Sequence, residues 1–358
     1  MFFRPEPAVE PGHAGRIGVL LCNLGSPDAP TPAAMRRYLA EFLTDPRVVE
    51  MPPALWRPIL HGMILRTRPA RSAAKYKLIW QREEGAPLLA WSRKQATLLR
   101  GYLGQRGHLV EVLPAMRYGQ PAIATQLDEL KARGCTRILV LPLYPQYAGA
   151  TTASVIDAVS AWARRARHVP ELRFVNRFHD HPAYIGALAQ LVQSHWKREG
   201  PEGRLVMSFH GLPQRARALG DPYHAECLKT ARLLAARLKL KEDEWTVSFQ
   251  SRFGRARWIG PATQTVLRDL ARAGVPRVNV LCPGFVSDCL ETLEEIDIEN
   301  RRAFLAAGGK AFGYVPCLND HPAWLAALAD IVQQHLQGWA AGGQPAPASS
   351  HLSNAPNP

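Results

Sequence analysis

A histidine at the end of an apolar run is the first residue of this sequence whose type and place suit chemistry. His210 closes the run R-L-V-M-S-F-H, which has the composition of a buried parallel strand. Open α/β sheets bind ligands beyond the carboxyl ends of their strands, so His210 is expected to project into a cleft. An imidazole there can accept a proton near neutral pH or bind a metal ion. The alternative is a loop histidine whose ring is satisfied by a backbone carbonyl.

An acidic stretch later in the chain is the natural partner of this histidine. Asp288 and Glu291 lie three residues apart at the expected start of a helix. One imidazole facing such carboxylates suits Fe²⁺ or another borderline divalent metal. The simpler alternative is a capping box, in which both side chains only start the helix. Three further acids follow at Glu294, Glu295 and Asp297, and for these a solvated helix face is the simpler interpretation.

Eight apolar runs alternate with amphipathic helical patterns and would position these side chains. Strands are expected at 17–24, 109–113, 138–143 and 172–175, and again at 205–209, 246–250, 278–282 and 311–315. Helices are expected at 87–103, 121–133, 183–197, 222–240 and 261–273. Strands that alternate with helices of this length predict parallel sheets covered on both faces. The fold class is therefore α/β, with two doubly wound domains that each hold a four-stranded parallel sheet.

The chain length of 358 residues suits two domains. We expect the first domain at 1–176, the second at 177–320, and a helix at 321–338 that packs back on the first domain. The Ala-, Gly- and Pro-rich residues 339–358 predict a disordered tail. The sequence similarity between the halves is too weak to be called a repeat. The start M-F-F-R-P-E-P does not resemble a signal peptide, and no apolar run reaches the roughly 18 residues of a membrane span.

Residues 51–82 form a segment of a different kind, because basic and apolar side chains are interleaved and acids are absent. The basic residues are Arg57, Arg66, Arg68, Arg71, Lys75, Lys77 and Arg82, and the apolar ones are Leu55, Trp56, Ile59, Leu60, Met63, Ile64 and Leu65. This mixture suits a lid or a lip that touches an anionic membrane surface. The alternative is an ordinary amphipathic helix pair packed on the domain.

The formal net charge of +14 favours acidic partners, which are nucleic acid, an anionic membrane or a carboxylate-bearing substrate. An Arg-rich host proteome is the plain alternative. No nucleic-acid recognition motif, G-x-G-x-x-G or phosphate loop is present, so nucleic acid and nucleotides are not expected as partners. The six cysteines are scattered and form no C-x-x-C pair, which indicates reduced thiols in a cytoplasmic protein and disfavours a zinc site.

Several long motifs, in the same order along the chain, resemble the ferrochelatase family. They are S-F-H-G-L-P at 208–213, G-D-P-Y at 220–223 and G-F-V-S-D-C-L-E-T-L-E-E at 284–295. N-L-G-S-P at 23–27, L-P-L-Y-P-Q-Y-A-G-A-T-T at 141–152 and W-I-G-P at 258–261 agree with them. The resemblance runs from about residue 17 to residue 337, which is nearly the whole expected folded chain.

The resemblance implies two Rossmann-like domains with a porphyrin cleft between them. It implies insertion of Fe²⁺ into protoporphyrin IX, which yields protohaem and two protons in the terminal step of haem biosynthesis. His210 is similar to the family's catalytic histidine, Glu291 to its essential glutamate and Asp288 to an acidic neighbour. His210 and Glu291 are also the implied metal ligands, and whether His210 takes a proton or binds iron stays open. The implied substrate-binding residues are Leu24, Arg117, Tyr118, Tyr144, Tyr147, Tyr223 and Trp258.

Two departures from the family pattern bear on cofactors. Some relatives carry a histidine where this chain has Cys289, which shifts weight onto Asp288 and Glu291. Some relatives bind an iron–sulfur cluster through C-terminal cysteines, and here no cysteine follows Cys317. We therefore expect no iron–sulfur cluster and no tightly bound cofactor, with Fe²⁺ and protoporphyrin IX as substrates.

The expected partners are a porphyrin and, peripherally, the surface of the inner membrane, for a protein that is otherwise cytoplasmic and monomeric. Two alternatives remain at this stage. One is a chelatase for another tetrapyrrole, either for coproporphyrin or for cobalt insertion. The other is a non-enzymatic haem or porphyrin carrier, which would not need the pair of His210 and Glu291. Protoporphyrin is favoured over coproporphyrin because an apolar lid at 55–65 gains by covering vinyl and methyl edges and leaves extra carboxylates unpaired.

Overall fold

The computed structural model of the protein describes residues 3, 6, 15–200, 203–252, 254 and 256–339. The predicted disordered tail at 339–358 lies outside the described residues except for Trp339. In the described ranges, no helix has both the length and the apolar character needed to cross a membrane.

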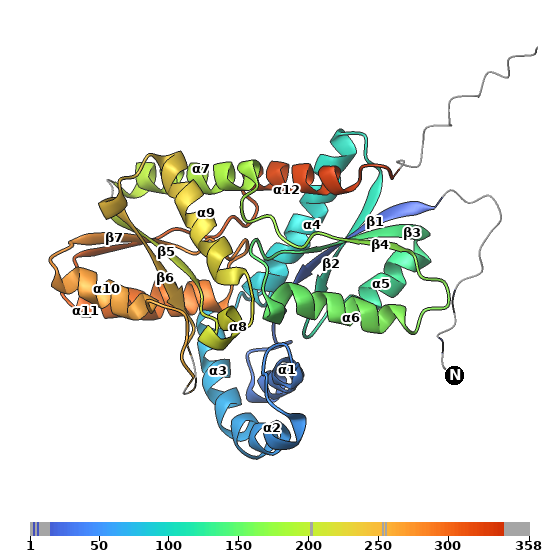
Figure 1. The fold of residues 1–358 in the computed structure, drawn as a ribbon, viewed down its shortest axis with the longest axis horizontal. Helices are drawn as coiled ribbons and strands as arrows, with labels where there is room; N and C mark the ends of the chain where they lie inside the picture. The colour runs from blue at the N-terminus through green and yellow to red at the C-terminus, as the bar shows by residue number, and fades with distance from the viewer. Residues whose placement is uncertain are drawn as a thin grey trace, which may run out of the picture.

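Two four-stranded parallel sheets form the framework, as the sequence pattern predicts (Figure 1). The first has the order β2-β1-β3-β4, and its strands are β1 (Arg16–Asn23), β2 (Val110–Met116), β3 (Cys135–Pro142) and β4 (Glu171–Phe174). The second has the matching order β6-β5-β7-β8, with β5 (Arg204–His210), β6 (Trp245–Gln250), β7 (Arg277–Leu281) and β8 (Ala311–Tyr314). The central strands are almost wholly buried because helices cover both faces, which is why they read as continuous apolar runs. The predicted α/β class is confirmed.

Helices connect the strands in the same order in both halves (Figure 1). The first half contains α4 (Pro87–Gln105), α5 (Ile123–Ala132), η2 (Gly149–Ala153), α6 (Ser154–Ala163) and α7 (Pro182–Glu199). The second half contains α8 (Gln214–Ala218), α9 (Tyr223–Leu238), η3 (Glu242–Glu244), α10 (Thr263–Arg272), η4 (Glu291–Asn300), α11 (Arg301–Ala306) and α12 (Pro322–His335). The helices predicted from periodicity are all present, with ends that differ by a few residues.

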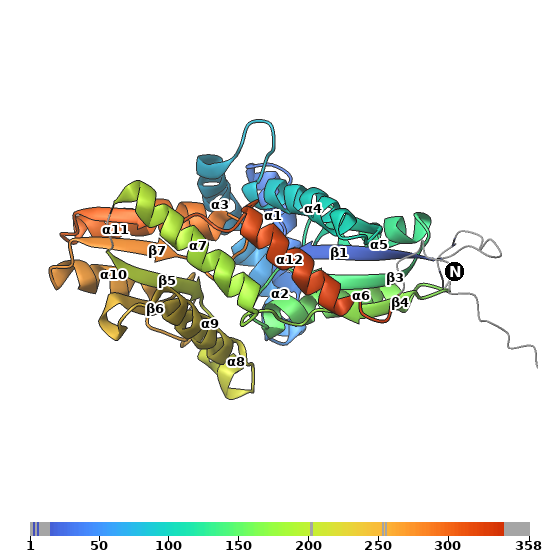
Figure 2. The same ribbon diagram turned by 90° about the horizontal axis from the view of Figure 1, so that it is seen from above.

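The last helix of each half packs on the other half. Helix α7 follows β4 but packs on α9, and α12 follows β8 but packs on α4, while α7 and α12 also pack on each other. Both helices lie across the top of the molecule and join the two sheets (Figures 1 and 2). Residues 180–195 and 320–335 share ten of sixteen identities, beginning D-H-P-A in both. The expectation that no repeat is detectable is therefore wrong for this helix, whose two copies fill matching positions in the fold.

One hydrophobic cluster spans both sheets, and three further clusters lie elsewhere in the described residues. The cluster that spans both sheets contains Leu21 of β1, Leu99 of α4, Phe209 of β5, Leu234 of α9 and Trp324 of α12. The crossing of α7 and α12 places side chains from each half in the interior of the other. The two sheets are therefore held by shared apolar burial as well as by the chain that connects them.

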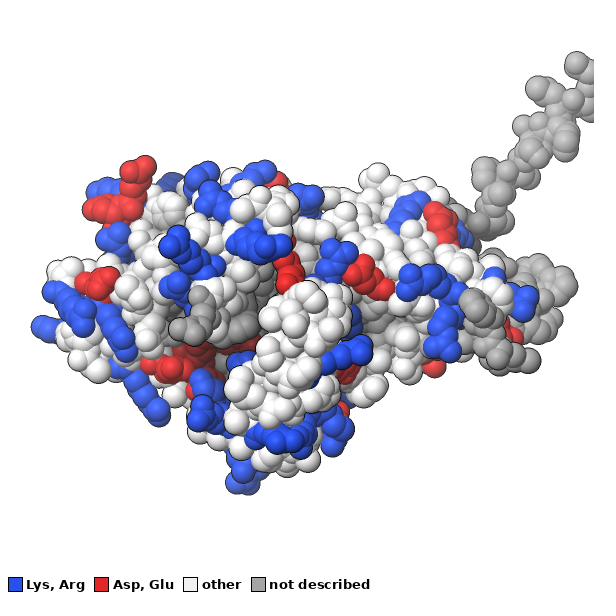
Figure 3. Space-filling view, turned by 60° about the horizontal axis from the view of Figure 1, so that its bottom comes forward, with Lys and Arg blue, Asp and Glu red and all other residues white. Residues whose placement is uncertain are grey.

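The segment at 51–82 folds into helices that stand beside the two sheets (Figure 1). These are α2 (Pro53–Ile59), η1 (Leu60–Ile64) and α3 (Leu65–Ile79), and α3 packs on α1 (Pro32–Thr44) and on η4. None of the residues of α2 is buried. In the space-filling view an uncharged lobe at α2 is bordered by Lys and Arg side chains, and Asp and Glu side chains line the hollow beside it (Figure 3).

Candidate active site

His210 is the last residue of β5, so the carboxyl end of a central strand presents it. Its Nδ1 atom lies 2.6 Å from the carbonyl oxygen of Gly211. If Nδ1 donates this bond, Nε2 carries no proton and can accept one or bind a metal ion. The carbonyl oxygen of His210 accepts a hydrogen bond of 3.0 Å from the hydroxyl of Tyr223. The sequence also allowed a histidine whose ring binds only a backbone carbonyl. Such a bond is present, but it uses Nδ1 and leaves Nε2 available.

One acid of η4, Glu295, lies near this histidine. Burial raises the pKa of Glu295 above its ordinary value, and the charge of Glu291 adds to the rise. The hydrogen bonds from Ser251 and the nearby His210 lower this pKa but do not cancel the rise. The charges of His210 and Glu291 therefore both act on the carboxylate of Glu295. The interpretation of Glu295 as part of a solvated helix face is wrong, since its carboxylate is bound by Ser251. The spacing of four residues from Glu291, about one helical turn, is the signal that places both on one face.

Asp288 has a different environment from Glu291 and Glu295. Its buried carboxylate accepts hydrogen bonds from the hydroxyl of Tyr314, from Nδ2 of Asn319 at 2.7 Å and from the hydroxyl of Thr292 at 3.1 Å. Helix η4 begins after Leu290, and no side chain among the described residues caps its first turn. The capping-box alternative is therefore wrong. The bonds turn Asp288 toward the end of β8, where it supports the loop before η4.

The predicted pair Arg117 and Tyr118 is bound to a carboxylate that the sequence analysis missed. Asp45 accepts hydrogen bonds from Arg117 at 2.6 Å, from the Tyr118 hydroxyl at 2.8 Å and from Ser154 at 2.6 Å. Burial raises the pKa of Asp45, but these three bonds and the N–H of Arg47 outweigh it and leave the pKa below its usual range. An Asp directly after a helix, where the dipole disfavours a negative charge, is the signal that marks it.

This network changes what Arg117 and Tyr118 offer to a ligand. The guanidinium of Arg117 also donates to the carbonyl oxygen of Ser154 at 2.9 Å and lies over the ring of Tyr118. Tyr118 has no exposed surface. The charge of Arg117 is thus balanced by Asp45, and the guanidinium packs on the buried ring of Tyr118.

The other predicted substrate-binding residues are placed at several strand ends. The Tyr144 hydroxyl, after β3, is buried and has no hydrogen-bond partner among the described residues. The backbone N–H of Tyr147 donates to Glu226 at 2.8 Å, which joins the loop after β3 to α9. The ring of Trp258 lies beside Gly211, 3.1 Å from where a Cβ would be. Tyr223 supports His210 through its hydroxyl.

Side chains of the first domain also reach Glu291. The tyrosines Tyr38 and Tyr76 are buried, which raises the pKa of both hydroxyls, and the charge of Glu291 raises it further. Leu24, after β1, and Leu290, before η4, pack against one hydrophobic cluster. The end of β1 and the start of η4 therefore meet where the two domains face each other. The fold brings together His210, Glu291 and Glu295, and it directs Asp288 elsewhere.

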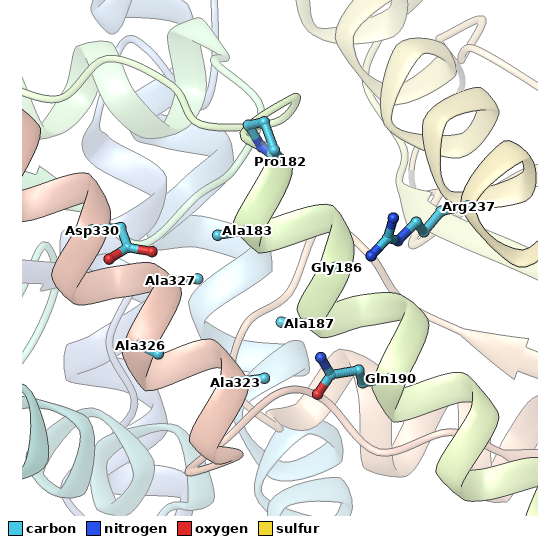
Figure 4. A pocket seen from close by; sticks show the side chains of 10 residues that line it. All are labelled: Pro182, Ala183, Gly186, Ala187, Gln190, Arg237, Ala323, Ala326, Ala327 and Asp330. Carbon is cyan, nitrogen blue, oxygen red and sulfur yellow. The ribbon is translucent and has the colours of Figure 1, made fainter.

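Two hollows of comparable size lie outside this region. One, of about 420 Å³, lies between α7 and α12, where alanines and Gly186 face one another (Figure 4). The other, of about 440 Å³, is lined by residues such as Ser26, Trp80 and Glu84. Within the described ranges, no group of three or more His, Cys, Asp or Glu side chains is arranged to hold a metal ion.

Comparison with known proteins gives one consistent family. The family model described as Ferrochelatase matches residues 16–336. The ferrochelatase of Methylibium petroleiphilum is 63% identical over 96% of this chain and 95% of the relative, and that of Polaromonas sp. is 60% identical over 95% and 93%. The solved structure of SirB from Bacillus subtilis with Fe3+ covers 89% of this chain and 95% of that chain, with a TM-score of 0.52 and 14% identity, a likeness of fold. The matched sites and the length of the match leave one conclusion, that this chain belongs to the ferrochelatase family.

Proposed function

We propose that the protein inserts Fe²⁺ into protoporphyrin IX at a site formed by His210, Glu291 and Glu295. The observation that supports the site is that the end of β6 binds two residues of η4: Gln250 donates to the carbonyl oxygen of Glu291, and Ser251 donates to the carboxylate of Glu295. The charges of His210 and Glu291 both act on that carboxylate. A porphyrin carrier needs an apolar surface for the ring but no such group of proton- and metal-binding side chains. The arrangement therefore favours catalysis over carriage.

The reaction replaces two pyrrole N–H bonds by bonds from nitrogen to iron and releases two protons. Bending of the bound macrocycle exposes its nitrogens, with the strain supplied by binding energy. His210, with Nδ1 held by the carbonyl oxygen of Gly211, is suited to take a proton through Nε2. Glu291 and Glu295 are suited to hold the incoming Fe²⁺ or to pass protons to water, and the raised pKa of Glu295 favours proton exchange.

The surroundings of the site support protoporphyrin over a porphyrin with four carboxylates. Arg117, a predicted substrate-binding residue, already has Asp45 as its partner and so offers little to an additional propionate. The hydroxyl of Tyr144 has no hydrogen-bond partner among the described residues, and such an apolar surrounding suits a ring with few charges. Competition between protoporphyrin and coproporphyrin at equal concentration measures this preference, and a higher kcat/KM for coproporphyrin would contradict it.

The test of the proposed site is the replacement of His210 by alanine. We expect His210→Ala to abolish the insertion of Fe²⁺ and of Zn²⁺ into porphyrin, while circular dichroism and the Tm stay close to those of the wild type. His168→Ala, at an exposed position before β4, is the matched control and should keep full activity. Turnover by His210→Ala at the wild-type rate would overturn the assignment.

We further propose that the lid contacts an anionic membrane surface at the periphery of the protein. Its outer face exposes Leu55 by 61% and Met63 by 56%, together with Met51 and Ile59. Basic side chains beside them, including Arg57, suit lipid phosphates. With the lid at the membrane surface, the protein can bind a substrate that partitions into lipid.

Vesicle binding tests the membrane contact. We expect Leu55→Asp with Met63→Asp to lose binding to vesicles of anionic phospholipid, because two charges would have to enter the interface. Turnover of detergent-dispersed porphyrin should not change. Leu109→Asp, at a residue that is 71% exposed beside β2, is the control for an added surface charge. Equal vesicle binding by both variants would contradict the proposed contact between the lid and the membrane.

For cofactors and assembly we propose a cytoplasmic monomer without an iron–sulfur cluster. The six cysteines, all within the described ranges, are buried free thiols. Visible absorption together with acid-labile sulfide in the purified protein would contradict the proposal on the cluster. Light scattering of the eluted protein measures the oligomeric state.

A further inference from the structure

The backbone at the end of β6 has an unusual conformation. Ser251, directly after the strand, has a φ of 60°, in the left-handed region that L side chains rarely adopt. Among the described residues other than glycine, Lys239 and Asn319 share a positive φ, and Lys239 ends helix α9, where this conformation is common. Strain of this kind persists where surrounding contacts impose it, and it gathers at functional sites.

The strained conformation of Ser251 directs two donors at one carboxylate. The backbone N–H donates to Oε1 of Glu295 at 2.7 Å, and the side-chain Oγ donates to Oε2 of the same residue. Two donors on the two oxygens fix both the position and the rotation of the carboxylate, and bonds to a charged acceptor are among the stronger ones in proteins. The orientation of Glu295 thus depends on Ser251.

The preceding residue, Gln250, holds the same helix through its backbone. Gln250 is 2% exposed, and its Nε2 donates to the carbonyl oxygen of Glu291 at 2.8 Å. Its Oε1 accepts a bond of 2.7 Å from Ser208, in the strand that ends at His210. Its own carbonyl oxygen accepts a bond of 2.7 Å from the N–H of Gly211, the residue after His210. Gln250 therefore contacts the main chain on both sides of the site.

Helix η4 needs such external contacts. Its ten residues form a π-helix, a form that mostly occurs as single turns, and no side chain in the described part of the chain caps its start. Lys75 of α3 binds Glu294 at 2.9 Å and Glu299 at 3.0 Å, and these two acids are not bound by Ser251. The contacts from the end of β6 are those that join Glu291 and Glu295 to the strands.

We propose that Gln250 and Ser251 form a clamp that sets the positions of Glu291 and Glu295 relative to His210, and that Ser251 is a positioning residue for the transfer of iron. The inference rests on the proposed function, because it assigns a role to Ser251 only through Glu295. A misplaced carboxylate slows delivery of the metal without removing a contact to the porphyrin. The effect should therefore appear in kcat and in the dependence on Fe²⁺, and hardly in KM for porphyrin.

Two substitutions of Ser251 separate positioning from stability. Ser251→Ala removes the Oγ bond, and we expect it to lower kcat by about tenfold, the usual scale for loss of a residue that orients a metal-binding group. Ser251→Gly also removes that bond but relaxes the backbone. It should have a higher Tm than Ser251→Ala and the same loss of kcat. Ser287→Ala is the control, because this hydroxyl is buried near η4 without a hydrogen-bond partner among the described residues.

A double-mutant cycle with Glu295→Gln completes the test. We expect Glu295→Gln to lower kcat, and Ser251→Ala to add no further loss in that background, because the two residues act as one unit. Losses that multiply would overturn the clamp, and so would wild-type kcat in both Ser251→Ala and Ser251→Gly while Glu295→Gln is slow. Wild-type kcat in Glu295→Gln would instead contradict the proposed role of Glu295 in the reaction.

Discussion

At the scale of single residues, the acids of η4 differ in what holds their carboxylates. Glu295 is bound by the end of β6, and Glu294 is bound by Lys75 on the lid side. Glu291 is held by Gln250 through its carbonyl oxygen, and its side chain lies beside the thiol of Cys289. Three acids that look alike in sequence therefore occupy three environments.

We predict that Glu291→Gln removes most of the activity and that Glu294→Gln removes much less. The first change takes a negative charge from beside Glu295, whereas the second weakens an ion pair whose lysine is also bound to Glu299. Initial rates of Zn²⁺ and Fe²⁺ insertion measure both. Equal losses would indicate that the helix acts as a general acidic surface, without a special role for Glu291.

Asp45 gives a prediction about stability and pH. Because its pKa is depressed in the folded protein, the carboxylate stabilises the fold above its ordinary pKa of about 3.9, and this contribution is lost as the pH falls through the folded-state pKa. Asp45→Asn leaves the partly buried charge of Arg117 without a partner, so we expect a loss of about 2–3 kcal/mol in the free energy of unfolding.

Urea unfolding between pH 5 and pH 8 measures this loss, which should be constant across that range because Asp45 is ionised throughout. Glu83→Gln, at an exposed position before α4, is a control for removing a surface acid. A difference between Asp45→Asn and wild type that varied strongly across the range would contradict the depressed pKa.

At the scale of elements, the crossing of α7 and α12 depends on small residues. Ala183 and Ala187 of α7 face Ala323 and Ala327 of α12 (Figure 4). Small side chains allow the helix axes to approach closely, since the interaxial distance follows the side chains at the contact. Both helices carry alanine at matching positions, so each presents small side chains to the other.

Gly186 lies in this region but is not needed for the close approach. A Cβ at Gly186 would meet no atom within 4 Å, and the matching position of α12 is Ala326. We therefore predict that Gly186→Ala raises the free energy of unfolding by about 0.5–1 kcal/mol through helix propensity, with unchanged activity. Gly25→Ala is the contrasting variant and should be strongly destabilised, since its φ is 110° and the Cβ would lie 1.8 Å from the Tyr118 carbonyl oxygen. Thermal unfolding compares the two, and a lower Tm for Gly186→Ala would show that the helices meet more tightly there.

At the scale of the whole molecule, the shared core links the stability of the two domains. Trp324 of α12 is fully buried and packs on Phe178 and Tyr184, with ring centroids at 5.7 Å and 6.1 Å. Tyr184 donates in turn to the carbonyl oxygen of Pro283, in the loop after β7. This aromatic group joins α7, α12 and the second sheet.

We predict that Trp324→Ala lowers the free energy of unfolding by about 3–5 kcal/mol and that both domains still unfold in one transition. Calorimetry and fluorescence in urea should give coincident transitions. Trp91→Ala, at a partly exposed position, is the control for loss of an indole. Two separated transitions in the wild type would show that the domains are independent in spite of their common core.

The sequence alone determined the eight strands, the main helices and the α/β class, because strands of parallel sheets are apolar along their whole length and helices are periodic. It also predicted His210 and Glu291 as site residues, since a strand end and a run of acids are local features, and their roles stay predictions. The resemblance of the motifs gave the family, which the family model and the relatives confirm.

Only the tertiary structure decided which side chains meet. Asp45 and Arg117 lie 72 residues apart in the chain, and Ser251 and Glu295 lie 44 apart, so no local pattern shows that they are bound to each other. Helices α7 and α12 each pack on the other half of the molecule, and Asp288 binds residues at the end of β8 and beyond it. Both arrangements follow from packing between distant segments. Such contacts are fixed when distant segments share one core, and that information is absent from the periodicity of any one segment.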